Sequence, residues 1–138
     1  MQIHVASDTM RPVLDHPDDL ASWLEPGTGL IRVIGQGRWT AAQVELHFVA
    51  LGNLIAERRR TGASVLVLVD LRDTLVQPAE IVERIGRAMT GVYATSDRVA
   101  VVVASSLLKL QLKRVANVAK IEFFVSMNAA RTWLTAHG

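Results

Sequence analysis

The chain has 138 residues, of which half are apolar, and it contains no cysteine. A domain of this length buries enough apolar surface to fold without covalent cross-links. The absence of cysteine excludes a disulfide framework, a thiolate zinc site, an iron–sulfur cluster and a cysteine nucleophile. The apolar fraction excludes a disordered chain. We therefore expect one domain over residues 1–138.

The formal net charge of +2 is unevenly distributed along the chain. Residues 1–25 carry one arginine against five acidic residues, a net charge of −4. Residues 98–138 carry six basic residues against one glutamate, a net charge of +5. This arrangement would suit pairing between subunits or an anionic partner, and it is equally typical of two solvated faces.

Two dense apolar runs, residues 65–69 and 99–104, bear on membrane insertion. A membrane-spanning helix needs about 20 apolar residues, so both runs are too short. The first residues lack the basic and apolar pattern of a secretory signal. We expect a cytoplasmic location and no membrane insertion.

The N-terminal part has two interpretations. Residues 18–25 have the composition of a short capped helix, and they equally suit a strand that pairs with residues 30–38 through a Pro-Gly turn at residues 26–29. Residues 1–19 are expected to form an arm or an edge strand.

From residue 30 onward, strand and helix patterns alternate. Thr40 and Gln43 have capping-box spacing, and the helix after them has its apolar stripe at 4-3-4 spacing and a candidate C-terminal cap at Gly62. The predicted order is strand 30–39, helix with Val44, Phe48, Leu51 and Ile55, strand 64–73, helix from Pro78 with Ile81, Ile85, Met89 and Val92, strand 98–106, helix from Ser105 or Ser106 to about Lys120, strand 121–126, and helix from Ser126 or Asn128 with Ala130, Trp133 and Leu134.

This alternation predicts an α/β fold with a mostly parallel sheet. The segments GLIRVIGQGRWT, VLVDLRD, RVAVVVASS and FFVSMNAARTWL, in this order over residues 20–138, resemble the SpoIIAA-like, or STAS-like, family of bacterial anti-sigma-factor antagonists. The resemblance implies a single mixed sheet of about four or five strands with helices packed mainly on one side. It favours the strand interpretation of residues 20–25. It also implies a more distant kinship with CRAL-TRIO lipid-binding domains.

The chain departs from that family at the phosphorylation site. The resemblance places a phosphorylatable serine, in an Asp-Ser-Gly type motif, about eight residues after an aspartate that corresponds to Asp70. Here residues 75–80 contain neither serine nor glycine, and Thr74 is the only nearby hydroxyl. The resemblance therefore supports the fold and leaves the phosphorylation switch without its serine.

Polar residues at strand ends are the candidate ligand-binding residues, because open α/β sheets bind ligands beyond the carboxyl ends of their strands. Asp70, Arg72 and Asp73 would form an acid–base or anion-binding cluster, or a bidentate Arg72–carboxylate pair that fixes the loop. Ser105 and Ser106 would bind an anion at a helix N-terminus, or simply cap that helix.

Several kinds of site lack their sequence pattern. The four histidines, His47 among them, show no metal-ligand spacing, and no phosphate-loop or dinucleotide motif is present. Aromatic residues are few and lie away from the lysines, which argues against nucleic-acid binding. We expect no metal, no cofactor and no nucleic-acid partner.

The predicted third helix has a wider apolar surface than one sheet face requires. Extra apolar surface of this kind marks an interface or lines a pocket. We expect a homodimer through this helix, with a further protein partner possible, and the candidate interface residues are Leu107, Leu110, Gln111, Arg114 and Val118.

Three functions follow from the sequence. The first is a non-enzymatic interaction or regulatory module, which would have no enclosed pocket. The second is a carrier of a small apolar or lipid-like ligand held between the third helix and the sheet. The third is an enzyme that uses Asp70, Arg72 and Asp73, which would require both carboxylates to face a cleft.

Overall fold

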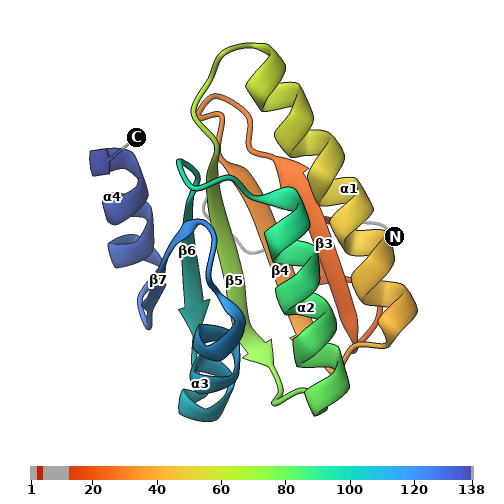
Figure 1. Cartoon of the computed structure of the whole chain (residues 1–138). Coiled ribbons are helices and arrows are strands. Elements are labelled where there is room, and N and C mark those ends of the chain that lie inside the picture. Colours follow the sequence, from red (N-terminus) through yellow and green to blue (C-terminus); the bar gives the residue numbers. More distant parts are fainter. Residues whose placement is uncertain (1–2, 5–12, 138) are drawn as a thin grey trace.

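The computed structural model describes residues 3–4 and 13–137. Strands and helices alternate from residue 31 to the end of the described chain (Figure 1). The elements are β1 (Ile3–His4), β2 (Val13–Leu14), β3 (Asp19–Leu24), β4 (Ile31–Gly37), α1 (Ala41–Arg60), β5 (Leu66–Thr74), α2 (Ala79–Val92), β6 (Arg98–Val103), α3 (Ser106–Val115), β7 (Lys120–Phe124) and α4 (Met127–His137).

Five strands form one mixed sheet in the order β3-β4-β5-β6-β7. β3 and β4 are antiparallel, and the other neighbouring pairs are parallel. Gly27 and Gly29, with φ values of 81° and 75°, make the turn between β3 and β4. Residues 20–25 are thus strand rather than helix up to Leu24, and the predicted mostly parallel α/β sheet is confirmed.

Helices cover the two faces of the sheet unequally. α1, α2 and α3 pack on one face, where the larger core cluster includes Leu51, Ile85 and Leu108. α4 alone packs on the other face, through Ala130 and Leu134. The expectation of helices mainly on one side is confirmed, and both faces of β5 and β6 are buried as their apolar runs predict.

The ends of α1 follow from its sequence. The Thr40 hydroxyl accepts a hydrogen bond from the Gln43 N–H, while the Gln43 side chain accepts from the Thr40 N–H, which forms the predicted capping box. At the other end Gly62 has a φ of 77° and donates its N–H to the Arg59 carbonyl. The boundaries of this helix are therefore local properties of the chain.

The third helix is shorter than predicted. α3 ends at Val115, and Ala116 leaves the helical conformation with a ψ of 100°. The prediction of a helix to about Lys120 was wrong because Lys120 already belongs to β7, where it lies opposite Arg98. Residues 116–119 are needed to return the chain to the sheet. A Cβ atom on Gly86 would lie 2.7 Å from the Val115 Cβ, so this glycine allows α2 and α3 to approach closely.

The N-terminal segment lies apart from the main sheet where it is described. Ile3–His4 and Val13–Leu14 pair with each other in an antiparallel two-stranded ladder. Leu14 packs with Ala21 and Ile34. The remainder of the predicted arm or edge strand lies outside the described residues. Within the described chain, β3 is one outer strand of the main sheet and β7 is the other.

Candidate functional site

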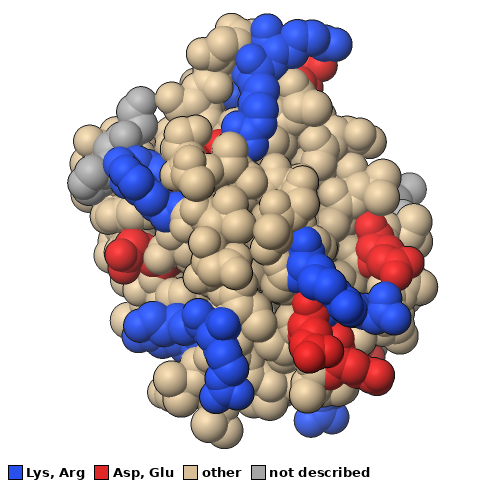
Figure 2. Space-filling view, viewed as in Figure 1, with Lys and Arg blue, Asp and Glu red and all other residues tan. Residues whose placement is uncertain are grey.

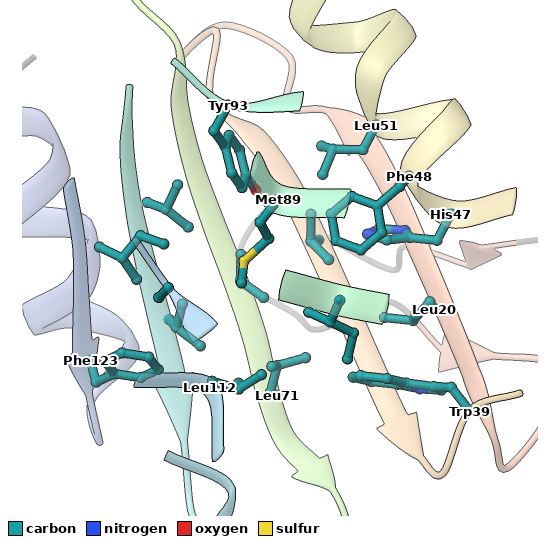
Figure 3. Close-up of a pocket in the computed structure, with 17 residues that line it drawn as sticks. Leu20, Trp39, His47, Phe48, Leu51, Leu71, Met89, Tyr93, Leu112 and Phe123 are labelled. Carbon is teal, nitrogen blue, oxygen red and sulfur yellow. The ribbon is translucent and has the colours of Figure 1, made fainter. Parts of the chain in front are cut away.

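An apolar pocket lies between the sheet and the helices α1 and α2 (Figure 3). Its volume is about 70 Å³. Every strand of the main sheet and three of the four helices contribute to its wall, and the lining residues are Leu20, Val33, Trp39, His47, Phe48, Leu51, Val69, Leu71, Ile85, Met89, Tyr93, Val99, Val101, Leu112, Ala116, Ile121 and Phe123.

The pocket exists because the helices cover this face incompletely. α3 ends at Val115 and is followed by the small residue Ala116. The floor beneath this region consists of valines of β6, which have short side chains. Phe48, Met89 and Phe123 also line the pocket and are only partly buried. The hollow therefore has a rim of partly exposed aromatic and methionine side chains.

Three side chains bring polar atoms to the pocket wall. The Trp39 Nε1–H is already used, because it donates to the carbonyl oxygens of Asp19 and Gln36. The His47 Nδ1 atom is buried without a hydrogen-bond partner, and burial lowers the pKa of this imidazole to about 4. Burial, with a smaller effect of the Asp97 charge, raises the pKa of the Tyr93 hydroxyl. All three groups are neutral near pH 7, so the pocket favours an uncharged, largely apolar occupant.

An ion pair between Arg59 and the buried Asp97 carboxylate lies next to the pocket residue Tyr93 in the chain. The Asp97 carboxylate accepts two hydrogen bonds from the Arg59 guanidinium, at 2.9 and 2.6 Å, and one from the Ala94 N–H at 2.7 Å. Asp97 is 1% exposed. These contacts join the end of α1 to the loop that follows Tyr93.

Of the predicted cluster of Asp70, Arg72 and Asp73, the first two residues form an ion pair. Arg72 donates to both Asp70 oxygens, from Nε and Nη2, at 2.9 Å each. Asp70 lies opposite Ile34 and Asp73 opposite Gln36, so β5 has one more residue than β4 in this stretch. A bulge of this kind changes the direction in which neighbouring side chains point. The backbone N–H of Arg72 also donates a hydrogen bond to the Asp70 carboxylate.

The geometry is that of a bidentate Arg72–carboxylate pair, the second of the two arrangements that the sequence allowed. Hydrogen bonds to Asp70 and the charges of Asp70 and Asp73 raise the pKa of Arg72. Asp70 is fully buried, whereas Asp73 is exposed. The two carboxylates therefore do not stand side by side in an open cleft. Binding of a ligand by these residues stays a prediction.

The two candidate serines lie at the start of α3. Ser105 is its N-cap residue, and the Ser105 hydroxyl accepts a hydrogen bond from the Leu108 N–H at 3.1 Å. Ser106 is the first helical residue and is exposed. This is the capping geometry that the sequence also allowed, and an anion site at these residues stays a prediction.

The predicted interface residues fall into two groups. Leu107, Leu110 and Arg114 lie on the exposed face of α3, and the two leucines are 64% and 57% exposed. Gln111 instead exchanges two hydrogen bonds with the backbone of Gln77, at 3.0 and 2.7 Å. Val118 follows the helix and packs against the core. Only the first group is placed to contact another molecule.

Thr74, the hydroxyl nearest to the family's phosphorylation position, is buried at the end of β5. Its Oγ1 atom has no hydrogen-bond partner. Gln77 fixes the loop that follows, because its side chain donates to the carbonyl oxygens of Gly37 and Leu75 and accepts from the Trp39 N–H. In this conformation the Thr74 hydroxyl is shielded from solvent.

Membrane-spanning helices and clusters of metal-ligating side chains are both absent from the part of the chain that the structure describes. None of its helices is long and apolar enough to span a membrane. No group of three His, Asp or Glu side chains gathers there as a metal site would require.

Sequence reasoning missed the pocket as a site. Its lining residues come from all five strands of the main sheet, from three helices and from the loops between them, and most of them also look like ordinary core residues in the sequence. The one local signal was His47, a polar residue beside an apolar stripe. The position of His47 in the sequence does not indicate that Met89 and Phe123 line the same pocket.

Comparisons with known proteins bear on the fold. No protein-family model matches this chain, and no curated protein does. A solved structure of an uncharacterised DUF3478-family protein from Shewanella loihica PV-4, described as having a SpoIIAA-like fold, is similar. The TM-score is 0.63 and the identity 18%, over 88% of this chain and 98% of that one. Together with the five-stranded mixed sheet and its four helices, this similarity shows that the chain has a SpoIIAA-like, STAS-type fold.

Proposed function

We propose that this STAS-like domain binds a small apolar ligand, or the apolar end of a larger one, in the pocket between α1, α2 and the sheet. The observation that carries the proposal is the pocket itself, which is lined almost entirely by apolar side chains. A pure interaction module would need no such hollow. The pocket therefore favours the second of the functions that the sequence suggested, a carrier, with the ligand mainly beneath α1 and α2 and not between the third helix and the sheet as expected.

The size of the pocket limits what it holds. An apolar cavity of about 150 Å³ accommodates benzene, and the volume here is about 70 Å³. The closed conformation has room for a short alkyl segment only. A longer chain would extend past the partly exposed Met89 and Phe123 side chains, which have rotatable bonds and lie at the rim.

The wall chemistry limits the ligand further. A charged headgroup inside the pocket would face neutral His47 and Tyr93 and would lose its hydration without compensation. A hydroxyl or carbonyl group, in contrast, would give the unpartnered His47 Nδ1 atom a hydrogen bond. Medium-chain alcohols are therefore the most suitable probes.

The test compares a filled pocket with an intact one. Ala116→Leu places a larger side chain on the pocket wall, and Ala129→Leu on exposed α4 is the matched control. Ligand-observed NMR with 1-octanol and 1-decanol should show binding to the wild type and the control, and at least tenfold weaker binding to Ala116→Leu. Equal binding by all three proteins, or no binding by the wild type, would contradict the proposal.

A second candidate is the interaction module, through the exposed face of α3. Leu107 and Leu110 are exposed there beside the basic residues Lys113 and Arg114. An acidic protein surface with an apolar groove would suit this face. Loss of partner binding in Leu107→Ser/Leu110→Ser, with alcohol binding retained, would support it. If Ala116→Leu instead loses alcohol binding and keeps partner binding, the carrier function is supported.

A further inference from the structure

A second surface, on the outside of α1, is unusual for a helix that packs on one sheet. The inner side of this helix is buried in the core through Val44, Leu51 and Ile55. Five outward residues are exposed and none carries a charge: Ala42, Leu46, Val49, Asn53 and Ala56. Leu46 and Val49 are 73% and 64% exposed, among the highest values for large apolar side chains in the described chain.

The spacing of these residues is regular. They follow one another at intervals of four, three, four and three residues, which is the heptad spacing of a coiled-coil seam. Such a seam is normally covered by another helix, with an occasional asparagine that determines register. In Figure 2 the surface over the upper part of α1 is tan, below the blue arginines at the helix end.

A groove lies beside this seam. It lies between α1 and β3, an outer strand of the sheet, and is lined by Asp19, Leu20, Ala21, Ser22, Gln43, Leu46, His47 and Ala50. Asp19 Oδ2, Ser22 Oγ and His47 Nδ1 are buried there without hydrogen-bond partners. Asp19 and His47 are 4% and 7% exposed. Leu46 belongs both to the seam and to the wall of the groove, so the two form one continuous surface.

We infer that this surface is an isologous dimer interface, in which α1 packs antiparallel against α1 of a second copy of the chain. A seam that is complementary to itself is what a two-fold interface requires. With the two-fold axis near Leu51, Val49 of one copy lies against Asn53 of the other, and Leu46 against Ala56. The full length of both helices then overlaps.

The charges at the two ends of the surface complement each other in this arrangement. Asp18 is exposed at the N-terminal end of α1, where its carbonyl accepts a hydrogen bond from Gln43. Arg60, whose side chain is 74% exposed, lies at the C-terminal end. Antiparallel packing brings Asp18 of one copy near Arg60 of the other. Parallel packing would place the two arginine-rich ends together.

The size of the surface suits a reversible dimer. A helix of 20 residues is about 30 Å long, and with the adjoining groove the surface is about 20 Å wide. The pair would bury about 1,200 Å², which is the lower limit for specific interfaces. We expect a concentration-dependent dimer rather than an obligate one.

Sedimentation analysis of the intact chain over a wide concentration range tests the interface. Leu46→Lys/Val49→Lys should weaken dimerisation at least 30-fold, whereas the matched pair Leu107→Lys/Leu110→Lys on α3 should leave it unchanged. Thermal melts check that both variants are folded. A monomeric wild type at millimolar concentration, or loss of the dimer only in the α3 variant, would overturn the inference.

Single cysteines test the orientation, since the chain has none of its own. In the antiparallel pair the two copies of residue 53 are about 6 Å apart along the helix axis, and the two copies of residue 42 about 27 Å. A short bismaleimide should therefore cross-link Asn53→Cys efficiently and Ala42→Cys poorly. Efficient cross-linking of both would show a parallel pair and reject the antiparallel arrangement.

Discussion

Helices α1 and α2 lie next to each other on the same sheet face, yet their outer surfaces differ. The exposed positions of α2 include Glu80, Glu83, Arg84 and Arg87, which is the usual polar surface of an amphipathic helix. α1 also exposes charged residues, Glu45 and Glu57 among them, but one stripe of its outer surface carries only alanines, Leu46, Val49 and an asparagine. The sheet explains one apolar side of each helix. It does not explain the second apolar side of α1, which therefore indicates a function outside the monomer.

The largest expected effect separates the two sides of α1. Leu51→Ala removes a side chain that is 1% exposed, and it should lower the free energy of unfolding by about 2–5 kcal/mol. Val49→Ala on the outer side should change the stability of the monomer by less than about 0.5 kcal/mol. Urea denaturation at low protein concentration measures both. Similar losses in the two variants would show that the outer side is packed within the monomer.

The next prediction concerns His47, a buried imidazole of α1 that borders both the pocket and the groove. Burial lowers its pKa from 6.5 to about 4, so the unfolded chain binds a proton more readily than the folded one. The stability contributed by the neutral imidazole is complete above pH 6.5 and is lost as the pH falls toward 4. The total loss is about 3 kcal/mol.

Urea denaturation between pH 7 and pH 4.5 tests this titration, with His47→Leu as the comparison. The variant should show little change over that range. Below pH 4.5 both proteins should lose stability, because the Arg131 hydrogen bonds lower the pKa of Glu25 to about 2 in the folded chain. The unfolded chain, in which this carboxyl keeps its ordinary pKa of 4.5, then binds the proton more readily than the folded one. An equal loss in both proteins above pH 4.5 would argue against His47 as the group responsible.

A smaller loss is expected where α1 is joined to the loop after α2. Asp97→Asn removes the charge that accepts hydrogen bonds from Arg59 and from the Ala94 N–H. We expect a decrease of about 1–3 kcal/mol in the free energy of unfolding. Alcohol binding should weaken as well, because Asp97 fixes the loop that directly follows Tyr93, a residue of the pocket wall. Unchanged binding in a folded variant would show that the pocket does not depend on this ion pair.

The smallest effect is expected at the exposed contact between the two helices. Arg84 of α2 and Glu45 of α1 form an ion pair of 3.0 Å, with side chains that are 42% and 67% exposed. Arg84→Ala should change stability by less than about 0.5 kcal/mol and leave dimerisation unchanged. A clear loss of dimer in this variant would move the interface from the outer side of α1 toward α2.

Local interactions explain why much of the fold was predictable. The capping box of Thr40 and Gln43, the Pro-Gly turn at residues 26–29 and the doubly buried runs of β5 and β6 each depend on neighbouring residues in the chain. The bidentate ion pair of Asp70 and Arg72 was predictable for the same reason, since the two residues are only two positions apart in the chain. The end of α3 was not local, because the pairing of Lys120 with Arg98 decides it.

By itself the sequence determined the alternation of strands and helices, the mixed sheet, the capping residues and the absence of cysteine chemistry. Periodicity and turn residues act over a few positions, so one sequence is enough to recognise them. Only the tertiary structure decided that residues from five strands and three helices line one apolar pocket, and that Asp19, Ser22 and His47 leave polar atoms unpartnered beside the seam of α1. These features depend on which side chains meet across the sheet, and that is determined by packing between residues far apart in the chain.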